Sequence, residues 1–318
     1  MSEVVVNQRK AAMIGCGFVG SASAYALMQS GIFSELVLID ANKDRAEGEA
    51  MDISHGVPFA KPMKIYAGDY DDIVDAGIII ITAGAAQKPG ETRLDLVNKN
   101  VNIFKSIIPE IKKRDCQGIL LVVANPVDIL TYTALKLSGF PKERVLGSGT
   151  VLDSGRLKYE LSEHLNVDSR SVHAFIIGEH GDSEIAAWSS ANVSGVPLNQ
   201  FCELRGHFEH EESMENIAER VKNSAYEIIA KKNATYYGIG MAVRKICETI
   251  IRDEKSVLPV SSYIDGDYGI NDVVLSLPAV VGAEGVQTRV PISLSDEEKE
   301  KLQESARTLK EVISQLDL

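Results

Sequence analysis

A histidine stands where an apolar run of the sequence ends. Residues 174–177 are apolar, Gly178 follows, and His180 comes two positions later, next to Glu179 ("IIGEHGD", 176–182). An apolar run that stops at a glycine is typical of a strand leaving the core. A histidine at that edge would be half sheltered, which suits a group that exchanges a proton near neutral pH. The alternative is a surface turn that contains a histidine by chance. Residues elsewhere in the sequence that could act with His180 would distinguish the two interpretations.

Two further segments carry groups that could act with this histidine. Asp153 and Arg156 lie three positions apart at the start of a predicted helix, so their side chains can share a face. Gln87 and Arg93 bound the segment "QKPGETR", in which proline and glycine indicate an exposed loop that could serve as a lid. Each residue also has a structural interpretation: a helix cap for Asp153, a surface ion pair for Arg156 and a solvated helix position for Arg93.

A glycine-rich segment near the amino terminus is typical of nucleotide binding. Gly15, Gly17 and Gly20 form the pattern GxGxxG ("GCGFVG") between a predicted strand and a predicted helix. Glycines there permit a tight turn and let the backbone approach a pyrophosphate, while the helix N-terminus adds positive potential. Asp40 follows the next strand, where an acid accepts hydrogen bonds from a ribose and repels a 2′-phosphate. These residues predict an NAD site and favour NAD over NADP; a structural turn that binds nothing is the alternative.

Hydrophobic periodicity indicates the elements that position these groups. The first half alternates short apolar runs with helical patterns, which predicts a parallel, doubly wound sheet of the α/β class. Its predicted strands are 11–14, 36–39, 78–81 and 119–123, and its predicted helices are 18–30, 43–53 and 93–114. The pattern changes at about residue 149, so we expect two domains, 1–148 and 149–318.

The second half reads as an α+β domain. Its predicted helices are 152–165, 211–232 and 240–252, its predicted strands are 172–177 and 183–190, and 257–263 with 273–277 form a predicted hairpin. The chain closes with a helix whose first turn carries Ser295 and Glu298 in the spacing of a capping box.

Composition and charge argue against several classes of function. The chain has 318 residues and a formal net charge of -12, which argues against nucleic acid or an anionic membrane as a partner. Its four cysteines are scattered without metal-ligand spacing, so we expect no metal site and the reduced thiols of a cytoplasmic protein. No secretion signal is evident at the amino terminus, and no apolar run is long enough to span a bilayer.

Six strings, in this order along the chain, carry a family resemblance: "GCGFVG", "ITAGAAQKPGETRLDLVNKN", "ANPVDILTY", "GSGTVLD", "SVHAFIIGEHGD" and "NATYYGI". On these strings the chain resembles the NAD-dependent L-lactate dehydrogenases, in particular those of bacteria, from its first strand to its last helix. The resemblance implies a Rossmann-type NAD-binding domain followed by a catalytic domain, pyruvate and L-lactate as substrates, and a homotetramer.

The resemblance also implies a chemical role for four residues. His180 would exchange a proton with the carbonyl oxygen of pyruvate as hydride arrives from NADH, and Asp153 would fix its ring and favour the imidazolium. Arg156 would hold the substrate carboxylate with a two-pronged contact. Arg93 would close over the carbonyl from a loop that begins near Ala85, stabilising the developing charge and excluding water.

The resemblance assigns the remaining site residues to substrate or cofactor. The implied substrate contacts are Gln87, Arg93, Asn125, Arg156 and Thr235. The implied cofactor contacts are Gly15, Gly17, Val19, Gly20, Asp40, Ala83, Gly84, Asn125 and Ile239, the last behind the nicotinamide ring.

The predicted preference for pyruvate over oxaloacetate rests on Gln87. In the similar malate dehydrogenases an arginine stands here and pairs with the second carboxylate of oxaloacetate. A glutamine offers no compensating charge, which favours pyruvate and lactate. A malate or other 2-hydroxyacid dehydrogenase is the alternative within the same class. A non-catalytic NAD-binding protein of this fold is an alternative from another class, and the set Arg93, Asp153, Arg156 and His180 argues against it.

One departure from the family pattern concerns regulation. Many bacterial members are activated by fructose 1,6-bisphosphate, which an arginine and a histidine bind between subunits. His173 matches the histidine, whereas Lys158 stands in place of the arginine. Lysine keeps the charge but lacks the bidentate fork, so we predict weakened, altered or absent activation.

Overall fold

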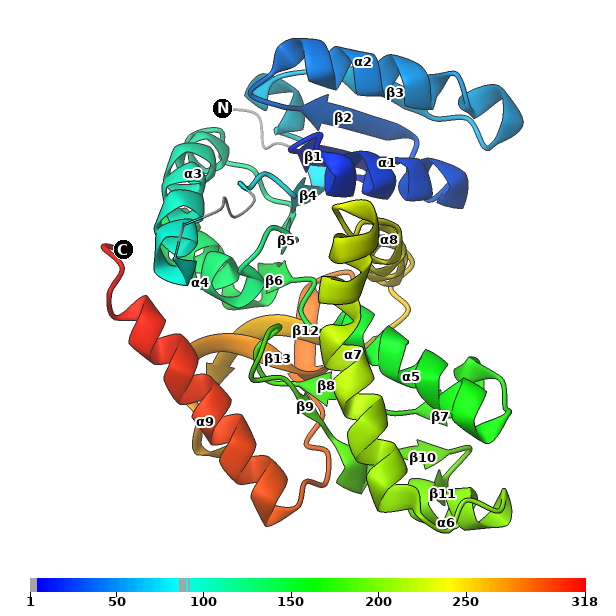
Figure 1. Ribbon diagram of the computed structural model, residues 1–318. Helices are drawn as coiled ribbons and strands as arrows, with labels where there is room; N and C mark the ends of the chain where they lie inside the picture. The colour runs from blue at the N-terminus through cyan, green and yellow to red at the C-terminus, as the bar shows by residue number, and fades with distance from the viewer. Residues whose placement is uncertain (1–4, 86–89, 91) are drawn as a thin grey trace.

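The core of the fold is a twisted sheet with helices on both faces (Figure 1). The computed structural model describes residues 5–85, 90 and 92–318. Six parallel strands come first along the chain: β1 (Asn7–Ile14), β2 (Glu35–Ile39), β3 (Lys64–Ala67), β4 (Ala76–Ile81), β5 (Ile119–Val122) and β6 (Val145–Gly147). Their order, β3-β2-β1-β4-β5-β6, is that of dinucleotide-binding folds, in which ligands bind where the order reverses, beside β1 and β4.

The four predicted strands of the first half are confirmed, and two strands were missed. β3 was missed because its sequence, "KIYA", is short and only partly buried. β6 was missed because it spans three residues, too few to show a period. Both complete the six-stranded parallel order.

Three antiparallel strands of the second half extend the same sheet. They are β12 (Ser256–Asp265), β13 (Asn271–Gly282) and β14 (Gly285–Arg289), and the predicted hairpin of β12 and β13 is confirmed. β12 joins the parallel strands through the pairing of Ser261 with Gly147 of β6. The sheet is therefore continuous across the change of pattern near residue 149.

The segments around the histidine form smaller sheets. Where one strand was predicted over 172–177, the structure has β7 (Val172–His173) and β8 (Ile176–Ile177). The prediction of one strand was wrong because β7 pairs with β10 (Asn192–Val193), whereas β8 pairs with β9 (Ile185–Ala186). β10 also pairs with β11 (Val196–Pro197), and the predicted strand 183–190 shortens to β9 followed by a single 3-10 turn, η5 (Trp188–Ser190).

The helices of the described residues are α1 (Phe18–Ser30), α2 (Lys43–Ser54), α3 (Arg93–Lys113), α4 (Val127–Ser138), α5 (Val151–Leu165), α6 (Leu198–Leu204), α7 (His210–Lys232), α8 (Tyr237–Ile251) and α9 (Asp296–Ile313). Of these, α5, α6 and α7 share a separate apolar cluster with β7 and β10, whereas the other helices cover the two faces of the sheet. Along β4, Ile78 and Ile80 face the core that contains α1, α2 and α8, while Ile79 and Ile81 face the core that contains α3, α4 and α9. This alternation explains why the strand is apolar throughout.

Further 3-10 turns connect the elements: η1 (Val57–Phe59), η2 (Tyr70–Ile73), η3 (Lys142–Arg144), η4 (Ser169–Ser171) and η6 (Asp267–Gly269). The capping box predicted at the start of α9 is present, because Ser295 accepts a hydrogen bond from the Glu298 N–H and Glu298 accepts one from the Ser295 N–H. Among the described residues, no helix has both the length and the apolar composition that crossing a membrane requires.

Candidate active site

The structure places the predicted histidine and aspartate in direct contact. His180 follows β8 after a turn at Gly178, whose φ of 88° favours glycine. The Nδ1 atom of His180 lies 2.6 Å from Oδ2 of Asp153, which is in the first turn of α5. The Asp153 side chain is 3% exposed and the His180 side chain 25% exposed, so the carboxylate is inside and the ring reaches the surface.

Arg156 shares the same carboxylate. Its Nη1 donates to Oδ1 of Asp153 at 2.8 Å, as the spacing of three residues predicted. Burial alone would raise the pKa of Asp153, but His180 and Arg156 outweigh it and hold that pKa below its usual value. Asp153 is therefore a carboxylate at neutral pH, and the remaining N–H groups of Arg156 can bind an anion.

The carboxylate in turn sets the proton affinity of His180. Burial alone would lower the pKa of His180, yet Asp153, with smaller contributions from Asp128 and Glu184, raises it to about 9. The imidazole thus carries both protons at neutral pH. Because Nδ1–H donates to Asp153, Nε2–H is the proton that can be given to a substrate oxygen.

The loop that carries His180 is fixed by several elements. Gly178 exchanges backbone hydrogen bonds with Ser276 of β13, at 2.9 Å each way. The backbone N–H of His180 donates to Asp128 of α4 at 2.8 Å. Further contacts come from Ser305 of α9 to the Glu179 N–H, and from Lys222 and Tyr226 of α7 to Asp182. The ring is therefore held on a backbone anchored to four elements.

Sequence reasoning missed Asp128 and Glu184. Asp128 is 2% exposed and belongs to the quoted string "ANPVDILTY", where an acid inside an apolar run was a usable signal. Glu184 lies close to Asp153 and His180, and burial with the charge of Asp153 raises its pKa. Its Oε1 atom is buried without a hydrogen-bond partner among the described residues.

The glycine-rich segment has the geometry that a pyrophosphate needs. At Gly15, with φ of 103°, a Cβ would lie 2.5 Å from the Ala83 nitrogen, and at Gly20 it would lie 2.0 Å from the Gly15 oxygen. At Gly17, the N-cap of α1, a Cβ would meet no described atom within 4 Å. No side chain caps α1 and its first turn has no acid, so its N–H groups face open space that suits an anion.

Asp40 lies beside that loop at the end of β2. Its Oδ2 accepts from the Cys16 N–H at 2.7 Å and its Oδ1 from the Asn42 N–H at 2.9 Å. The carboxylate is therefore fixed next to the glycine turn, where the ribose of a bound dinucleotide is expected.

The loops after β4 and β5 are joined by a residue that we did not predict. Asn100 of α3 is 1% exposed; its Oδ1 accepts from the Ala85 N–H at 2.8 Å and its Nδ2 donates to the Asn125 carbonyl at 2.8 Å. Ala83 and Gly84 lie in the first of these loops, and Asn125 is exposed in the second, before a cis peptide bond to Pro126. Asn100 is the last residue of the string "ITAGAAQKPGETRLDLVNKN", one of the six that carry the family resemblance.

Two predicted site residues lie at or just before the start of α8, and one lies at the start of α1. Thr235 is half-buried just before α8, Ile239 is half-buried in its first turn, and Val19 is half-buried in the first turn of α1. α8 packs against α1 so closely that a Cβ at Gly240 would lie 2.9 Å from the Ala22 oxygen. Gln87 and the Arg93 side chain lie outside the described part of the chain, so their roles stay predictions.

Two family models match this chain in succession. The lactate/malate dehydrogenase NAD binding domain matches residues 9–147, and the lactate/malate dehydrogenase alpha/beta C-terminal domain matches residues 150–317. The chain belongs to the lactate/malate dehydrogenase family. NAD is accordingly its cofactor, and the uncapped N-terminus of α1 with its glycine turn fits this group.

Family relatives match over nearly the whole chain. An L-lactate dehydrogenase of Acetivibrio thermocellus is 55% identical, covering 98% of this chain and 98% of the relative. L-lactate dehydrogenase 1 of Clostridium acetobutylicum is 55% identical over 96% of this chain and 98% of the relative. The crystal structure of the minor L-lactate dehydrogenase from Enterococcus mundtii in the ligands-bound form matches with a TM-score of 0.95 at 44% identity, covering 98% of this chain and 99% of that one.

The two residues predicted to bind an effector lie on neighbouring elements of this family fold. Lys158 of α5 is half-buried, its ammonium lies 5.7 Å from the ring centroid of Phe175, and burial lowers its pKa. His173 is exposed on β7. Neither position is tested by the family match, so the predicted loss of activation stays a prediction.

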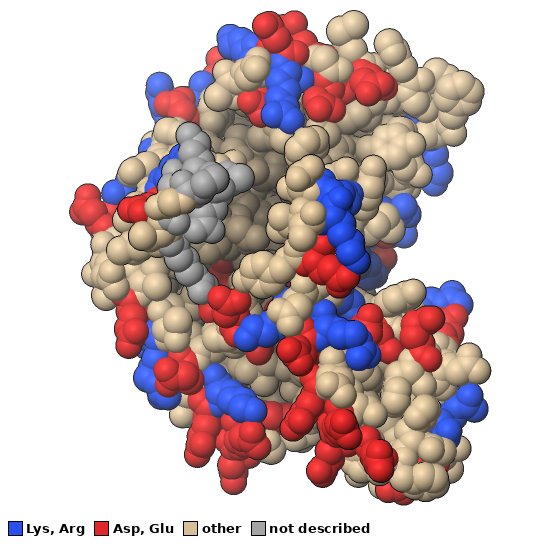
Figure 2. Space-filling model, in the orientation of Figure 1, with Lys and Arg blue, Asp and Glu red and all other residues tan. Residues whose placement is uncertain are grey.

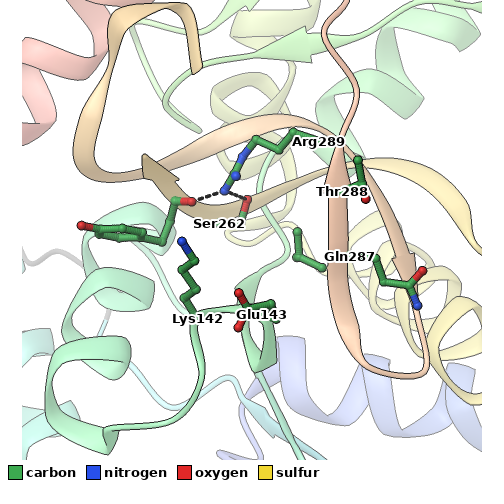
Figure 3. Close-up of a pocket in the computed structure, with 8 residues that line it drawn as sticks. Lys142, Glu143, Ser262, Gln287, Thr288 and Arg289 are labelled. Atoms are coloured by element: carbon green, nitrogen blue, oxygen red, sulfur yellow. Dashed lines mark hydrogen bonds between the residues drawn. The ribbon is translucent and has the colours of Figure 1, made fainter. Parts of the chain in front are cut away.

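The face drawn in Figure 2 shows acidic and basic side chains interspersed around a hollow whose visible floor carries neither. A separate hollow of about 220 Å³ lies between η3, β12 and β14 (Figure 3). There Arg289 donates to the Tyr263 carbonyl and to Ser262 Oγ, and pairs with Asp267 at 3.4 Å. None of the described residues that line this hollow is among the predicted site residues.

Asp153, His180 and Glu184 are close enough together to hold a metal ion, with ligand atoms within 4.8 Å of one another. Asp153, however, already binds Arg156, and a protonated imidazole has no lone pair for a metal. Both contacts argue against a metal ion at this cluster, and the predicted absence of a metal stays a prediction.

Proposed function

We propose that the chain is an L-lactate dehydrogenase, which interconverts pyruvate and L-lactate with NADH and NAD as the redox pair. The observation that carries the proposal is the shared carboxylate of Asp153, with His180 on one oxygen and Arg156 on the other. It provides a proton donor and a carboxylate-binding cation side by side, which a 2-oxo acid requires. The 55% identical relatives carry the same name.

The residues divide the reaction between them. Arg156 binds the carboxylate of pyruvate, and its tie to Asp153 fixes its place relative to His180. When bound in reduced form, NAD supplies hydride to the carbonyl carbon. His180 gives its Nε2 proton to the carbonyl oxygen, so that pyruvate, a hydride and a proton become lactate; Asp153 stabilises the imidazolium before the transfer and orients the ring. In the reverse direction neutral His180 accepts the hydroxyl proton.

The cofactor is held by the first half of the chain in this proposal. Gly15, Gly17 and Gly20 with the N-terminus of α1 would hold the pyrophosphate, and Asp40 the ribose. The remaining contacts would come from Val19, Ala83, Gly84, Asn125 and Ile239, and the substrate pocket would include Gln87, Arg93, Asn125 and Thr235. We assign residues 1–148 to NAD binding and 149–318 to catalysis, a division that follows the two family matches.

We further propose a cytoplasmic homotetramer. All four cysteines are free and buried, as suits a reducing compartment. Large apolar side chains are exposed on α1, α2, α5 and α8, which supports association through these helices: Phe18, Tyr25, Met51, Tyr159, Tyr237 and Met241. Fructose 1,6-bisphosphate would act weakly or not at all, because Lys158 lacks a guanidinium fork and is half-buried.

The test is steady-state oxidation of NADH with pyruvate and, separately, with oxaloacetate, each with and without fructose 1,6-bisphosphate. We expect a strong preference for pyruvate and little response to the bisphosphate. Equal or better use of oxaloacetate would identify a malate dehydrogenase instead. No oxidation with either acid at any pH would favour a non-catalytic NAD-binding protein.

A further inference from the structure

The connection between α7 and α8 holds a lysine against the faces of two tyrosine rings. Lys232 is the last residue of α7, which Asn233 ends with φ of 67°. Tyr236 and Tyr237 stand at the start of α8. The Lys232 ammonium lies 3.5 Å from the ring centroid of Tyr236 and 4.2 Å from that of Tyr237. Because a cation is attracted to the face of an aromatic ring, the two tyrosines fix the place of this charge.

One of these tyrosines also contacts the start of α1, against which α8 packs (Figure 1). The Tyr236 ring stacks on the Phe18 ring, with centroids 5.5 Å apart and 22° between the planes. Phe18 is the first residue of α1 and follows Gly17 of the glycine turn. Phe18 is 65% exposed, so the stack lies at the surface rather than in the core. Through the Tyr236 ring, the Lys232 ammonium is placed close to the first side chain of the helix at whose N-terminus we propose the pyrophosphate.

The Lys232 side chain is exposed and forms no ion pair with an acid in the described part of the chain. The neighbouring Lys231 also lies in the last turn of α7, but it pairs with Glu227 of the preceding turn. Figure 2 shows basic side chains beside the hollow, over the region where α7 passes into α8. A fixed cation that no acid neutralises attracts anions to its surroundings, although the net charge of the whole chain is -12.

The start of α1 supplies less positive charge than a pyrophosphate needs. The pyrophosphate of a dinucleotide carries two negative charges, whereas the N-terminus of a helix acts as about half a positive charge. Asp40 accepts from the Cys16 N–H at 2.7 Å and so adds a negative charge beside the same turn. An additional cation near this end of α1 would therefore strengthen the binding of the dinucleotide.

We propose that Lys232 is a cofactor-binding residue: its ammonium, fixed by Tyr236 and Tyr237, attracts the pyrophosphate of NAD to the start of α1. The inference rests on the part of the proposed function that places the pyrophosphate at the glycine turn. The two tyrosines are positioning residues, since they hold the charge without bearing it. The charge acts on the cofactor alone, so the affinity for the dinucleotide depends on it and the affinity for pyruvate does not.

The experiment is Lys232→Met, which removes the charge and keeps an unbranched apolar side chain against the rings. Dissociation constants of NADH, ADP-ribose and adenosine are measured by calorimetry at ionic strengths of about 0.01 M and about 0.15 M. One ammonium about 8 Å from two negative charges in water strengthens binding about fourfold at the lower ionic strength and about twofold at the higher. We therefore expect these losses for NADH and ADP-ribose, and none for adenosine, which lacks the pyrophosphate.

Two further variants separate the charge from other effects. Lys231→Met removes a charge from the same turn of α7, but one that Glu227 neutralises, so the affinity for NADH should change less than about 1.5-fold. Lys232→Arg keeps the charge and should bind NADH within the same limit. A loss for NADH below about 1.5-fold at low ionic strength in Lys232→Met overturns the inference. An equal loss for adenosine, or in Lys231→Met, overturns it as well.

The same measurements distinguish a failure of this inference from a failure of the proposed function. If ADP-ribose binds the unmodified protein no more tightly than adenosine does, the pyrophosphate site at the glycine turn is wrong and the inference falls with it. If the pyrophosphate strengthens binding and Lys232→Met leaves that gain unchanged, only the inference is overturned. Because no turnover is needed, an absence of pyruvate reduction would count against the proposed lactate dehydrogenase and leave the binding results valid.

Discussion

Replacement of Asp153 by asparagine tests the proposed mechanism most directly. The carboxylate binds His180 and Arg156, and it is the largest influence that raises the pKa of His180 to about 9 from the usual 6.5. That difference of 2.5 units corresponds to about 3 kcal/mol in favour of the imidazolium. In Asp153→Asn the pKa of His180 should fall back to about 6.5, because burial is then opposed only by the smaller contributions of Asp128 and Glu184.

The loss of protonation accounts for only part of the expected effect. At pH 7 a fall of the pKa from about 9 to 6.5 reduces the protonated fraction about fourfold. By analogy with other His–Asp pairs, removal of the aspartate costs about three to four decades in rate. The larger part must therefore come from the ring itself, which an asparagine amide can hold in the wrong tautomer, and from the loosened Arg156.

The assay is kcat/KM for pyruvate reduction between pH 5 and pH 9. We expect a loss of about a thousandfold at pH 7 that acid recovers only in part, since acid restores the proton but not the ring orientation. Asp168→Asn is the matched control, because Asp168 forms a similar pair with Arg170 at 2.6 Å, but on the surface. Activity within about tenfold of the unmodified protein, at pH 7, would refute the assigned role of Asp153.

Three further predictions concern stability, cofactor and substrate. The raised pKa of His180 contributes stability that is complete below about pH 6.5 and is lost as pH rises through about 9, so Tm should fall over this range, and His180→Gln should flatten the fall. Asp40→Asn should lower the KM for NADPH about tenfold or more and raise that for NADH, as initial rates with each cofactor would reveal; unchanged preference would exclude Asp40 from the ribose site. Arg156→Lys should raise the KM for pyruvate about tenfold to a hundredfold, because a lysine cannot make the two-pronged contact; a normal KM would place the carboxylate elsewhere.

The sequence predicted contacts that depend on local periodicity. The pairing of Asp153 with Arg156 follows from a spacing of three on a helix, and the turn at Gly15 follows from a strand, a glycine pattern and a helix in succession. Four strands of the first half, β1, β2, β4 and β5, were predicted because each is apolar on both faces. In each case the information lies within about twenty neighbouring residues.

Contacts between distant segments were not predictable in the same way. Asp128 and His180 are 52 residues apart, and Ser261 lies another 133 residues from Asp128. An acid within an apolar run signals a buried carboxylate, but nothing in the run identifies its partner. The division of 172–177 between two sheets was missed for the same reason, since it depends on which distant strand each end pairs with.

The continuous sheet explains how the two halves form one site. The proposed hydride donor is bound by loops of the first half, whereas the proton donor His180 belongs to the second, and their separation must be fixed for both transfers to reach one carbonyl group. The pairing of Ser261 with Gly147 fixes the register between β12 and β6, and the same Ser261 donates to Asp128. Since Asp128 holds the His180 backbone from α4, the junction that joins the halves also sets the position of the proton donor. A change at this junction should therefore alter kcat more than cofactor affinity.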